Sequence, residues 1–238
     1  MNNIKPYNKN ESKKEQIRRM FNNIASNYDI LNSLLSFGID NFWRKKAVSY
    51  IGKPKKVLDI ATGTADFAII TAKYTSAQIT GIDISEKMLE IGKKKIKKKN
   101  LENRINLKLA DCENLPFADK IFDSATVGFG VRNFENQNKG LKEIYRTLKK
   151  GGTLTILEPN TPKKFPFKNI YNLYFNKILP LIGGLISKDK EAYSYLPNSV
   201  KEFPAKEIFI KDLKNIGFTK SKHISLSFGI ISLYIAIK

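Results

Sequence analysis

The feature that most constrains the fold of this chain is the stretch from Val57 to Asp66, which reads VLDIATGTAD. Its apolar start, Val57 to Ile60, is typical of a buried parallel strand. Small residues around Gly63 then predict a tight turn, and an amphipathic helix follows the turn. Small residues at such a turn let the backbone approach a ligand that a Cβ atom would exclude. The stretch therefore predicts the first half of a nucleotide-binding βαβ unit.

Two acidic residues indicate which ligand this unit binds. Asp59 lies at the end of the strand, and the spacing Asp-x-Ala-x-Gly-x-Ala differs from the G-x-G-x-x-G pattern that packs a pyrophosphate against a helix. Asp83 ends the next apolar stretch, about 20 residues further on, where a carboxylate that binds ribose is expected. The two acids suit an amino-acid-bearing nucleoside without phosphates, which describes S-adenosylmethionine better than NAD. The alternative is a turn with no ligand-binding role.

A third acid follows the third predicted strand. Asp111 and Cys112 come directly after Ile105 to Leu109, at the position that reaches the adenine in this fold. We expect the Asp111 carboxylate to accept from the exocyclic amine and the Cys112 backbone to meet a ring nitrogen. Since the carboxyl ends of parallel strands share one edge, these residues are expected to converge with Asp59 and Asp83 in one crevice.

Other cofactor-binding candidates lie at the same edge. Gly63 is in the first turn, and Gly128 follows the fourth strand, beside the place where a transferable methyl group would project. The segment Leu115 to Phe117 offers apolar cover for a flat base. No spacing typical of a metal site is present, so no metal is expected.

Strand and helix patterns alternate five times, which predicts a doubly wound parallel sheet. Gly151-Gly152 is expected to end the helix before the fifth strand with a left-handed cap. Two final strands, Lys222 to Phe228 and Ile230 to Ile237, predict a closing hairpin, which the methyltransferase version of this sheet has and the dehydrogenase version lacks. We expect an α/β fold of the Rossmann-like class I S-adenosylmethionine-dependent methyltransferase type: a mostly parallel seven-stranded sheet with an antiparallel C-terminal strand.

The chain before the first strand is predicted to be helical. Ser12 to Glu15 reads as a capping box, the helix breaks at Gly38, and a second helix carries Trp43. Such a prefix would lie over the carboxyl edge of the sheet. We therefore expect a single domain, 1–238, with four parts: a helical N-terminal cap (1–50), a cofactor-binding core (51–160), an apolar helical lid insertion (161–204), and a closing helix with a strand hairpin (205–238).

The insertion 161–204 is rich in aromatic and bulky aliphatic residues. It fits a lid over an apolar substrate, a contact with a membrane surface, or a helical subdomain packed on the edge of the sheet. Its longest apolar run, Ile178 to Ile186, contains Pro180 and is too short to span a bilayer.

The formal net charge of the 238 residues is +20. It points either to a partner with many phosphates, to an anionic membrane, or to a general bias of the chain toward lysine, which is the simpler explanation. The single Cys112 forms no internal disulfide, and Met1 to Met20 lacks the apolar core of a secretory signal. We expect a cytoplasmic protein, either free or peripheral on the inner face of the membrane.

Several motifs are specific enough to indicate a family. From about Met20 to the C-terminus the chain resembles the demethylmenaquinone/2-methoxy-6-polyprenyl-1,4-benzoquinol methyltransferases, the quinone-ring C-methyltransferases of menaquinone and ubiquinone biosynthesis. The matching segments are Tyr28 to Asn32, Leu35 to Gly38 with Trp43, Asp59 to Asp66, Leu115 to Phe117, Gly130 to Asn133, Leu148 to Gly152 with Glu158, and Tyr195 to Ser199. The departures are Asp40 where the family usually has His, Ala65 for Gly, and Gly128 and Asn160 for Ser.

The resemblance implies cofactor contacts at Thr64, Asp83, Asp111 and Cys112, and methyl transfer from S-adenosylmethionine to a ring carbon of a reduced, prenylated quinone. Demethylmenaquinol is the favoured substrate, and the benzoquinol step of ubiquinone biosynthesis is the alternative. A nucleic-acid methyltransferase is more distant, because the loop after the fourth strand lacks the Asn/Asp-Pro-Pro-aromatic motif of amino-group methylation. No nucleic-acid partner is expected, and the oligomeric state stays open, a homo-oligomer included.

Methylation of a quinol carbon needs a base, or a cation that stabilises the phenolate. Arg132, on the loop after the fourth strand, is the first catalytic candidate. Tyr28 and Asn133 are candidates for shaping the pocket, and the sole histidine, His223, is expected to be structural.

Overall fold

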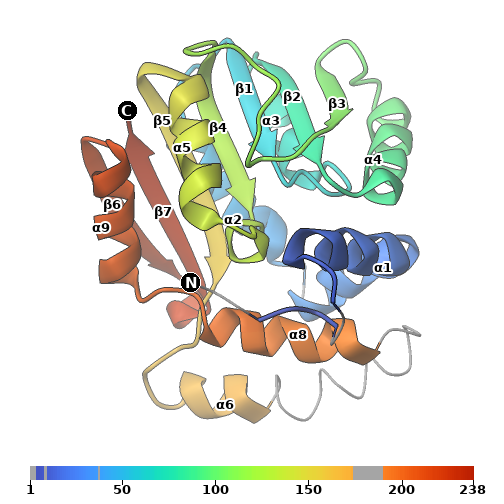
Figure 1. Cartoon of the computed structure of the whole chain (residues 1–238), viewed down its shortest axis with the longest axis vertical. Coiled ribbons are helices and arrows are strands. Elements are labelled where there is room, and N and C mark those ends of the chain that lie inside the picture. Colours follow the sequence, from blue (N-terminus) through green and yellow to red (C-terminus); the bar gives the residue numbers. More distant parts are fainter. Residues whose placement is uncertain (1–3, 8–9, 37, 174–189) are drawn as a thin grey trace.

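The computed structural model describes residues 4–7, 10–36, 38–173 and 190–238. Their strands form one sheet in the order β3-β2-β1-β4-β5-β7-β6 (Figure 1). Neighbours among β1 to β5 pair in parallel, whereas β7 runs antiparallel to both β5 and β6. The strands are β1 (Lys56–Ile60), β2 (Gln78–Asp83), β3 (Ile105–Leu109), β4 (Phe122–Gly128), β5 (Leu148–Pro159), β6 (Lys220–Leu226) and β7 (Ile231–Ile237). This topology confirms the predicted fold class and the closing hairpin.

Helices cover both faces of the sheet. On one face, α2 (Asp40–Val48), α3 (Asp66–Tyr74) and α4 (Glu86–Lys98) pack on alternate strand residues such as Val57 and Ile79. On the other face, α5 (Gln137–Thr147) and α9 (Lys206–Ile216) pack on Leu58, Ile82 and their neighbours (Figure 1). Because successive strand residues point to opposite faces and both faces are covered, the central strands β1 and β4 are buried over most of their length.

The helix α1 (Lys13–Leu35) lies across the carboxyl ends of the strands, as predicted (Figure 1). The capping box forms: the Ser12 backbone N–H donates to the Glu15 carboxylate at 3.1 Å, and the Glu15 N–H donates to the Ser12 hydroxyl at 3.2 Å. Further along, the Ser85 hydroxyl donates to the Asn22 side-chain oxygen at 2.7 Å. Polar contacts therefore fix α1 against the start of α4.

The insertion contributes α6 (Phe167–Leu173) and α8 (Lys190–Lys201). Residues 174–189, which include the apolar run Ile178 to Ile186, lie outside the described residues. Tyr195 of α8 packs with Ile17 and Met20 of α1. In the described parts of the chain, we find no helix whose length and apolarity would let it cross a bilayer.

The prediction that Gly151-Gly152 caps a helix is wrong. The helix α5 ends at Thr147, and Leu148 is already extended with φ −73° and ψ 143°. Leu148 is fully buried and pairs with Phe122 at the start of β4, so strand pairing ends the helix before the glycines are reached. Gly151, at φ +78°, instead lies in an irregular part of β5, where its N–H donates to the Lys238 carbonyl at 2.8 Å.

Candidate active site

The turn after β1 has an alternating backbone conformation. Ala61, Gly63 and Ala65 have φ values of +52°, +55° and +69°, at the three small positions of the Asp-x-Ala-x-Gly-x-Ala spacing. For residues with a Cβ, the left-handed region costs roughly 1–2 kcal/mol each, so the two alanines hold strain that Gly63 avoids. The small residues keep the turn close to the sheet, which leaves room for a ligand above it.

Asp59 holds this turn from below. Its carboxylate accepts from the Thr62 hydroxyl at 2.5 Å and from the Thr126 hydroxyl at 2.6 Å. The side chain is fully buried, and burial raises the pKa of Asp59 to about 6. Asp59 is absent from the described lining of both cavities below, so its carboxylate lies behind the turn and does not face a ligand as expected.

A cavity with an empty volume of about 680 Å³ opens at the carboxyl ends of the strands, under α1. Five of the predicted cofactor-binding residues line it, and we name it the cofactor cavity: Gly63, Asp83, Asp111, Cys112 and Gly128.

Asp83 joins the turn to the wall of this cavity. One carboxylate oxygen accepts from the Gly63 N–H at 2.8 Å, and the other accepts from the Ser85 N–H at 2.9 Å. Burial raises the pKa of Asp83 above its ordinary value. The carboxylate is thus held in one orientation, with lone pairs left over for a ligand.

Lys14 of α1 pairs with Asp111 across the mouth of the cofactor cavity. Its Nζ lies 2.6 Å from the Asp111 carboxylate and 3.7 Å from that of Glu113. Sequence reasoning missed Lys14, because in a chain rich in lysine nothing in the local sequence marks a lysine that pairs with a distant residue. Next to Asp111, burial raises the pKa of the Cys112 thiol well above its ordinary value, so Cys112 stays a neutral thiol.

The charges around the cofactor cavity fit S-adenosylmethionine. The described residues of its lining include four acids and a single cation, Lys14; the acids are Asp83, Asp111, Glu113 and Glu135. This excess of carboxylates repels a pyrophosphate and favours a sulfonium cation, an amino group and hydroxyls. Gly128 adds close packing, because a Cβ at this position would lie 2.9 Å from the Phe67 ring.

Thr64, a predicted cofactor contact, directs its side chain elsewhere. Its hydroxyl donates to Asp29 of α1 at 2.6 Å and accepts from Lys95 of α4 at 3.1 Å. Lys95 also pairs with Asp29 at 2.9 Å and with Asp66 of α3. These contacts connect α1 to α3 and α4. From the sequence, Lys95 is one member of a lysine-rich helix end.

A second cavity, of about 1120 Å³, lies beside the first, and we name it the acceptor cavity. Its walls come from α1, α2, α8, the loop after β4 and the start of β7. Most of the lining is apolar, including Met20, Ile24, Trp43, Leu196 and Ile231. Four residues line both cavities: Phe21, Tyr28, Phe129 and Asn133. A group bound in one cavity therefore lies next to a group bound in the other.

Arg132 is the most constrained charged group of the acceptor cavity. It lies in η1 (Val131–Asn133), directly after β4, and its guanidinium pairs with Glu158 at 3.0 Å and donates to the Phe129 carbonyl. Glu158, at the end of β5, is fully buried and also accepts from the Val131 N–H at 2.7 Å. Burial raises the pKa of Glu158 above its ordinary value. The Arg132 Nε is buried and has no hydrogen-bond partner among the described residues, so it can donate to a ligand.

The other two catalytic candidates shape the wall between the cavities. Asn133 accepts from the Tyr195 hydroxyl of α8 at 3.1 Å, which connects the insertion to the site. Tyr28 reaches both cavities from α1, and burial raises the pKa of its hydroxyl. The three candidates Arg132, Asn133 and Tyr28 are therefore brought together around the acceptor cavity, whereas His223 lies on β6 and contacts Ser232.

A charged group beside Arg132 was not predicted, and Asp40, noted above as a departure from the family, also lies in this part of the site. The Lys13 side chain is buried and donates to the carbonyls of Arg132 at 2.9 Å and Phe134 at 3.0 Å. Burial, together with the Arg132 charge, lowers the pKa of Lys13 to about 8. Asp40 pairs with Arg44 in the acceptor cavity and accepts from the Ser36 hydroxyl at 3.2 Å.

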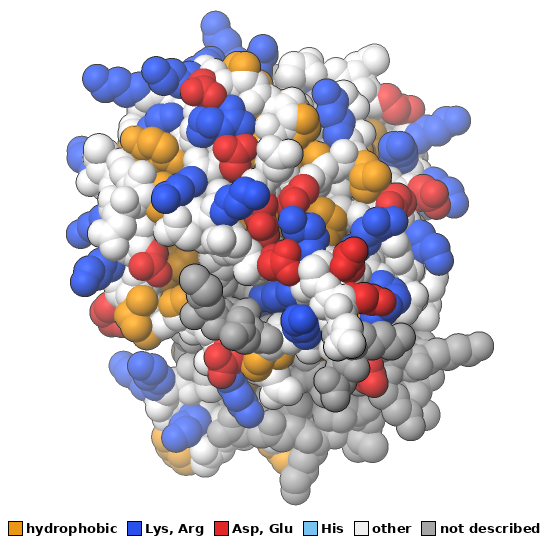
Figure 2. Space-filling model, viewed as in Figure 1, with side chains coloured by type: hydrophobic (Ala, Val, Ile, Leu, Met, Phe, Trp, Pro, Cys, Tyr) orange, Lys and Arg blue, Asp and Glu red, His pale blue; other side chains and the backbone are white. Residues whose placement is uncertain are grey.

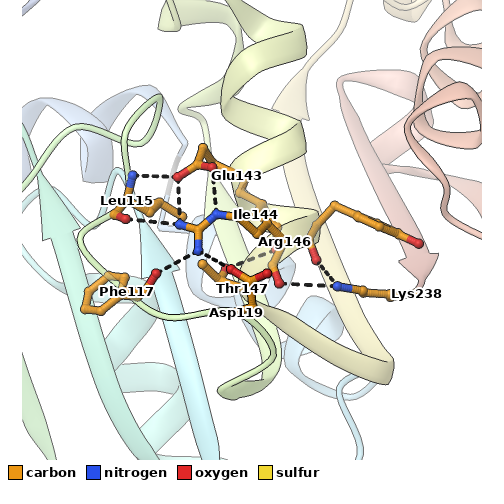
Figure 3. A network of polar contacts seen from close by, with 9 residues as sticks. Leu115, Phe117, Asp119, Glu143, Ile144, Arg146, Thr147 and Lys238 are labelled. Carbon is orange, nitrogen blue, oxygen red and sulfur yellow. Dashed lines mark hydrogen bonds and ion pairs between the residues drawn. The ribbon is translucent and has the colours of Figure 1, made fainter.

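The loop that carries Asp111 and Cys112 is held in place by Arg146 of α5 (Figure 3). The guanidinium donates to the carbonyls of Leu115 at 3.1 Å and Phe117 at 2.8 Å, and it pairs with Asp119 and Glu143. Leu115 is buried in the core, and neither it nor Phe117 belongs to the described lining of the two cavities. The apolar cover over the base therefore stays a prediction for this segment.

Solved structures with a similar arrangement of strands and helices include S-adenosylmethionine-dependent methyltransferases. An S-adenosylmethionine-dependent methyltransferase of Thermotoga maritima superimposes with a TM-score of 0.67 at 20% identity, over 93% of this chain and 99% of that one. A putative S-adenosylmethionine-dependent methyltransferase of Methanococcus maripaludis gives a TM-score of 0.66 at 22% identity, over 98% and 95% of the two chains. The fold is that of the class I S-adenosylmethionine-dependent methyltransferases.

The sequence relatives are much closer. Residues 9–238 match the ubiE/COQ5 methyltransferase family. Demethylmenaquinone methyltransferase of Bacteroides fragilis is 46% identical over 238 residues, which are 99% of this chain and 97% of that protein. The ubiquinone/menaquinone biosynthesis C-methyltransferase UbiE of Geotalea daltonii is 48% identical over 226 residues, 93% and 96% of the two chains. The chain belongs to the ubiE/COQ5 methyltransferase family; it is a methyltransferase, and its cofactor is S-adenosylmethionine.

Proposed function

We propose that this protein methylates a ring carbon of a reduced, prenylated quinone, converting demethylmenaquinol to menaquinol in menaquinone biosynthesis. The observation that carries the proposal is the meeting of the two cavities, an acid-lined one at the strand ends and an apolar one beside it, across Phe21, Tyr28, Phe129 and Asn133. The names of the relatives in Bacteroides fragilis and Porphyromonas gingivalis support the naphthoquinol.

Residues of the strand ends hold the cofactor. Asp83 would accept hydrogen bonds from hydroxyl groups, and Asp111 and Cys112 would meet the base, with Gly63 allowing close approach and Gly128 lining the cavity beside Phe67. Asp59 and Thr64 support the turn from behind through the contacts described above. When bound, S-adenosylmethionine supplies an electrophilic methyl group on a sulfonium.

Arg132 would activate the acceptor. A quinol carbon becomes nucleophilic when the neighbouring hydroxyl loses its proton, and a guanidinium stabilises the resulting phenolate or orients a water that takes the proton. Glu158 and the Phe129 carbonyl hold the Arg132 head group in place, and the Nε–H stays available for the oxygen.

Alignment of the two reactants supplies the rest. Tyr28 and Asn133 stand between the cavities, and Tyr195 secures Asn133 from the insertion, so the acceptor ring is held beside the methyl group. Holding reactants in the right geometry contributes up to ~7–11 kcal/mol in favourable cases. Because a prenylated quinol resides in a bilayer, we expect the protein to meet its substrate at a membrane surface, with α8 of the insertion lining the acceptor cavity.

A methyl-transfer assay tests the proposal. Purified protein with methyl-labelled S-adenosylmethionine is incubated with short-tailed demethylmenaquinol, with the matching benzoquinol, and with the oxidised form of each. We expect label in the reduced naphthoquinol and none in the oxidised rings, which carry no hydroxyl to deprotonate. Transfer to the benzoquinol alone would move the activity to ubiquinone biosynthesis, and transfer to neither quinol would refute the proposal.

A further inference from the structure

The two most exposed large apolar side chains of the described residues lie close to one groove. Phe165 is 82% exposed and Phe228 is 71% exposed, and both line a groove formed by the segment before α6, the segment between α8 and α9, and the β6–β7 turn. An exposed phenylalanine favours an apolar partner, because its ring gains free energy when water is removed. Such side chains beside one groove indicate an interaction surface.

Five lysines surround these rings. We define the lysine–phenylalanine surface as Lys163, Lys164, Phe165, Lys168, Lys201, Lys206 and Phe228. Glu207 is the one acid of the groove lining that is described, and it pairs with Lys206 at 3.4 Å. The surface therefore carries an excess of positive charge, which is complementary to phosphate groups.

The charge alone would prove little in this chain, which has 42 Lys and Arg residues. Figure 2 shows that Lys and Arg are spread over the described part of the face in view, with Asp and Glu among them. What distinguishes the groove is the combination of lysines with exposed phenylalanine. The Phe228 ring stacks on Phe167 of α6 with centroids 4.0 Å apart and an interplanar angle of 5°, and the Phe165 side chain is largely open to solvent.

The surface borders the acceptor cavity. Pro159, at the end of β5, lines both the groove and that cavity. On the β6–β7 turn, Gly229 lines the groove and the next residue, Ile230, lines the cavity. Figure 1 places α6 at the end of the molecule that also carries α8, below the carboxyl ends of the strands. A partner bound to the surface would therefore lie next to the apolar pocket.

We infer that the lysine–phenylalanine surface docks the protein on a bilayer that contains anionic phospholipid. The lysines pair with the phosphate groups, and Phe165 enters the boundary between head groups and acyl chains. A bilayer is favoured over a nucleic acid because the neighbouring cavity is apolar. The inference rests on the proposed function for the origin of the acceptor, but docking itself is measured without any quinol.

Vesicle sedimentation of the full chain tests the inference. The vesicles are made of phosphatidylcholine alone or of phosphatidylcholine and phosphatidylglycerol in equal parts. We expect binding to the mixed vesicles and little binding to the neutral ones. Replacing Lys163, Lys164 and Lys168 together by Gln should lower the affinity on the order of 100-fold, since each lysine near an anionic surface contributes about fivefold.

A matched triple variant on α4 is the control. Lys93, Lys94 and Lys97 are exposed, and their replacement by Gln removes the same charge far from the groove in the fold. This variant should bind the mixed vesicles within about threefold of the wild type, because salt screens distant charges. Phe165→Ser should lower the affinity at least about tenfold, the effect of one buried aromatic side chain.

Other outcomes overturn the inference. Equal losses in the two triple variants would show a general effect of net charge, and failure of the wild type to bind mixed vesicles would exclude docking. Binding of single-stranded RNA through Lys163, Lys164 and Lys168, without vesicle binding, would assign the surface to nucleic acid. In the variant with Gln at positions 163, 164 and 168, the rate of methyl transfer to a short-tailed quinol without vesicles should equal that of the wild type. If the wild type docks but methylates no quinol, the docking surface stands and the proposed function falls.

Discussion

The pair Arg132–Glu158 gives a sharp test of the site, because its structural and catalytic roles can be separated. Glu158 is fully buried and Arg132 is 7% exposed. Arg132→Met leaves the Glu158 carboxylate without its cation, and breaking a buried pair from one side costs about 3–5 kcal/mol. In the double variant Arg132→Met/Glu158→Gln, the new amide oxygen can still accept from the Val131 N–H. The loss of unfolding free energy should then fall to about 1–2 kcal/mol.

The pH dependence of the unfolding free energy also tests the role of the Arg132–Glu158 pair. A buried acid with a raised folded-state pKa contributes stability that is complete below its unfolded pKa and is lost as the pH rises through the folded pKa. Burial raises the pKa of Glu158, and the Arg132 charge opposes this rise. Without Arg132 the pKa of Glu158 rises further. The stability of Arg132→Met relative to the double variant, which has no carboxyl group at position 158, should therefore increase as the pH falls from about 8 to about 5.

Two measurements follow, urea unfolding over this range and methyl transfer from labelled S-adenosylmethionine to the quinol. Both variants should lose methyl transfer about 100-fold or more, as when a preorganised donor is removed. Calorimetry should show unchanged cofactor binding, because Arg132 lines the acceptor cavity and not the cofactor cavity. A pH-independent difference between the two variants, or a double variant no more stable than Arg132→Met, would refute the account of the pair. Retained turnover would remove Arg132 from the mechanism.

Three further predictions concern the cofactor cavity and α1. Asp83→Asn removes the charge and leaves an acceptor for only one of the Gly63 and Ser85 N–H groups, so the Kd for S-adenosylmethionine should rise about 10- to 100-fold in calorimetry, and an unchanged Kd would exclude the contact. Gly92→Ala puts a Cβ 2.8 Å from Leu107 Cδ1 and 3.3 Å from Ala65 Cβ. Overpacking should outweigh a gain in helix propensity of about 1 kcal/mol, so the unfolding free energy measured in urea should fall by about 1 kcal/mol. A more stable variant would contradict this, and Lys94→Ala on the exposed face of α4 is the control. Because the pKa of Lys13 is lowered to about 8, folding releases a proton from about pH 8 up to the ordinary lysine pKa, and this group favours folding more as the pH rises. The stability of the wild type relative to Lys13→Met, from urea unfolding, should therefore increase over that range, and a constant difference would show that Lys13 does not titrate there.

The sequence predicted best those site residues whose positions follow from neighbouring residues in the chain. A strand, a small-residue turn and an acid at the next strand end lie close together in the chain, so Gly63, Asp83, Asp111 and Gly128 were placed at one cavity. Asp59 lies in the same stretch, yet its carboxylate points into the protein, because Thr126 of the neighbouring strand supplies a buried donor. Strand register decides that contact, and a motif does not contain the register.

The charged partners could not be predicted for a related reason. Lys13, Lys14 and Lys95 make their contacts with residues far away in sequence: Lys13 with carbonyls after β4, Lys14 with Asp111, and Lys95 with Asp29 and Asp66. In a chain rich in lysine, composition does not distinguish a paired lysine from a solvated one. Likewise, Gly151-Gly152 satisfies the pattern of a helix cap, but pairing of Leu148 with Phe122 ends α5 earlier.

The position of α1 has a thermodynamic consequence. One helix supplies Lys14 and Ile17 to the first cavity, Met20 and Ile24 to the second, and Phe21 and Tyr28 to both. A ligand in either cavity therefore stabilises α1 in its position over both cavities. The second ligand then binds with higher affinity, because the helix is already ordered. By linkage the effect is reciprocal: quinol should tighten nucleoside retention by the same factor that the nucleoside tightens quinol retention.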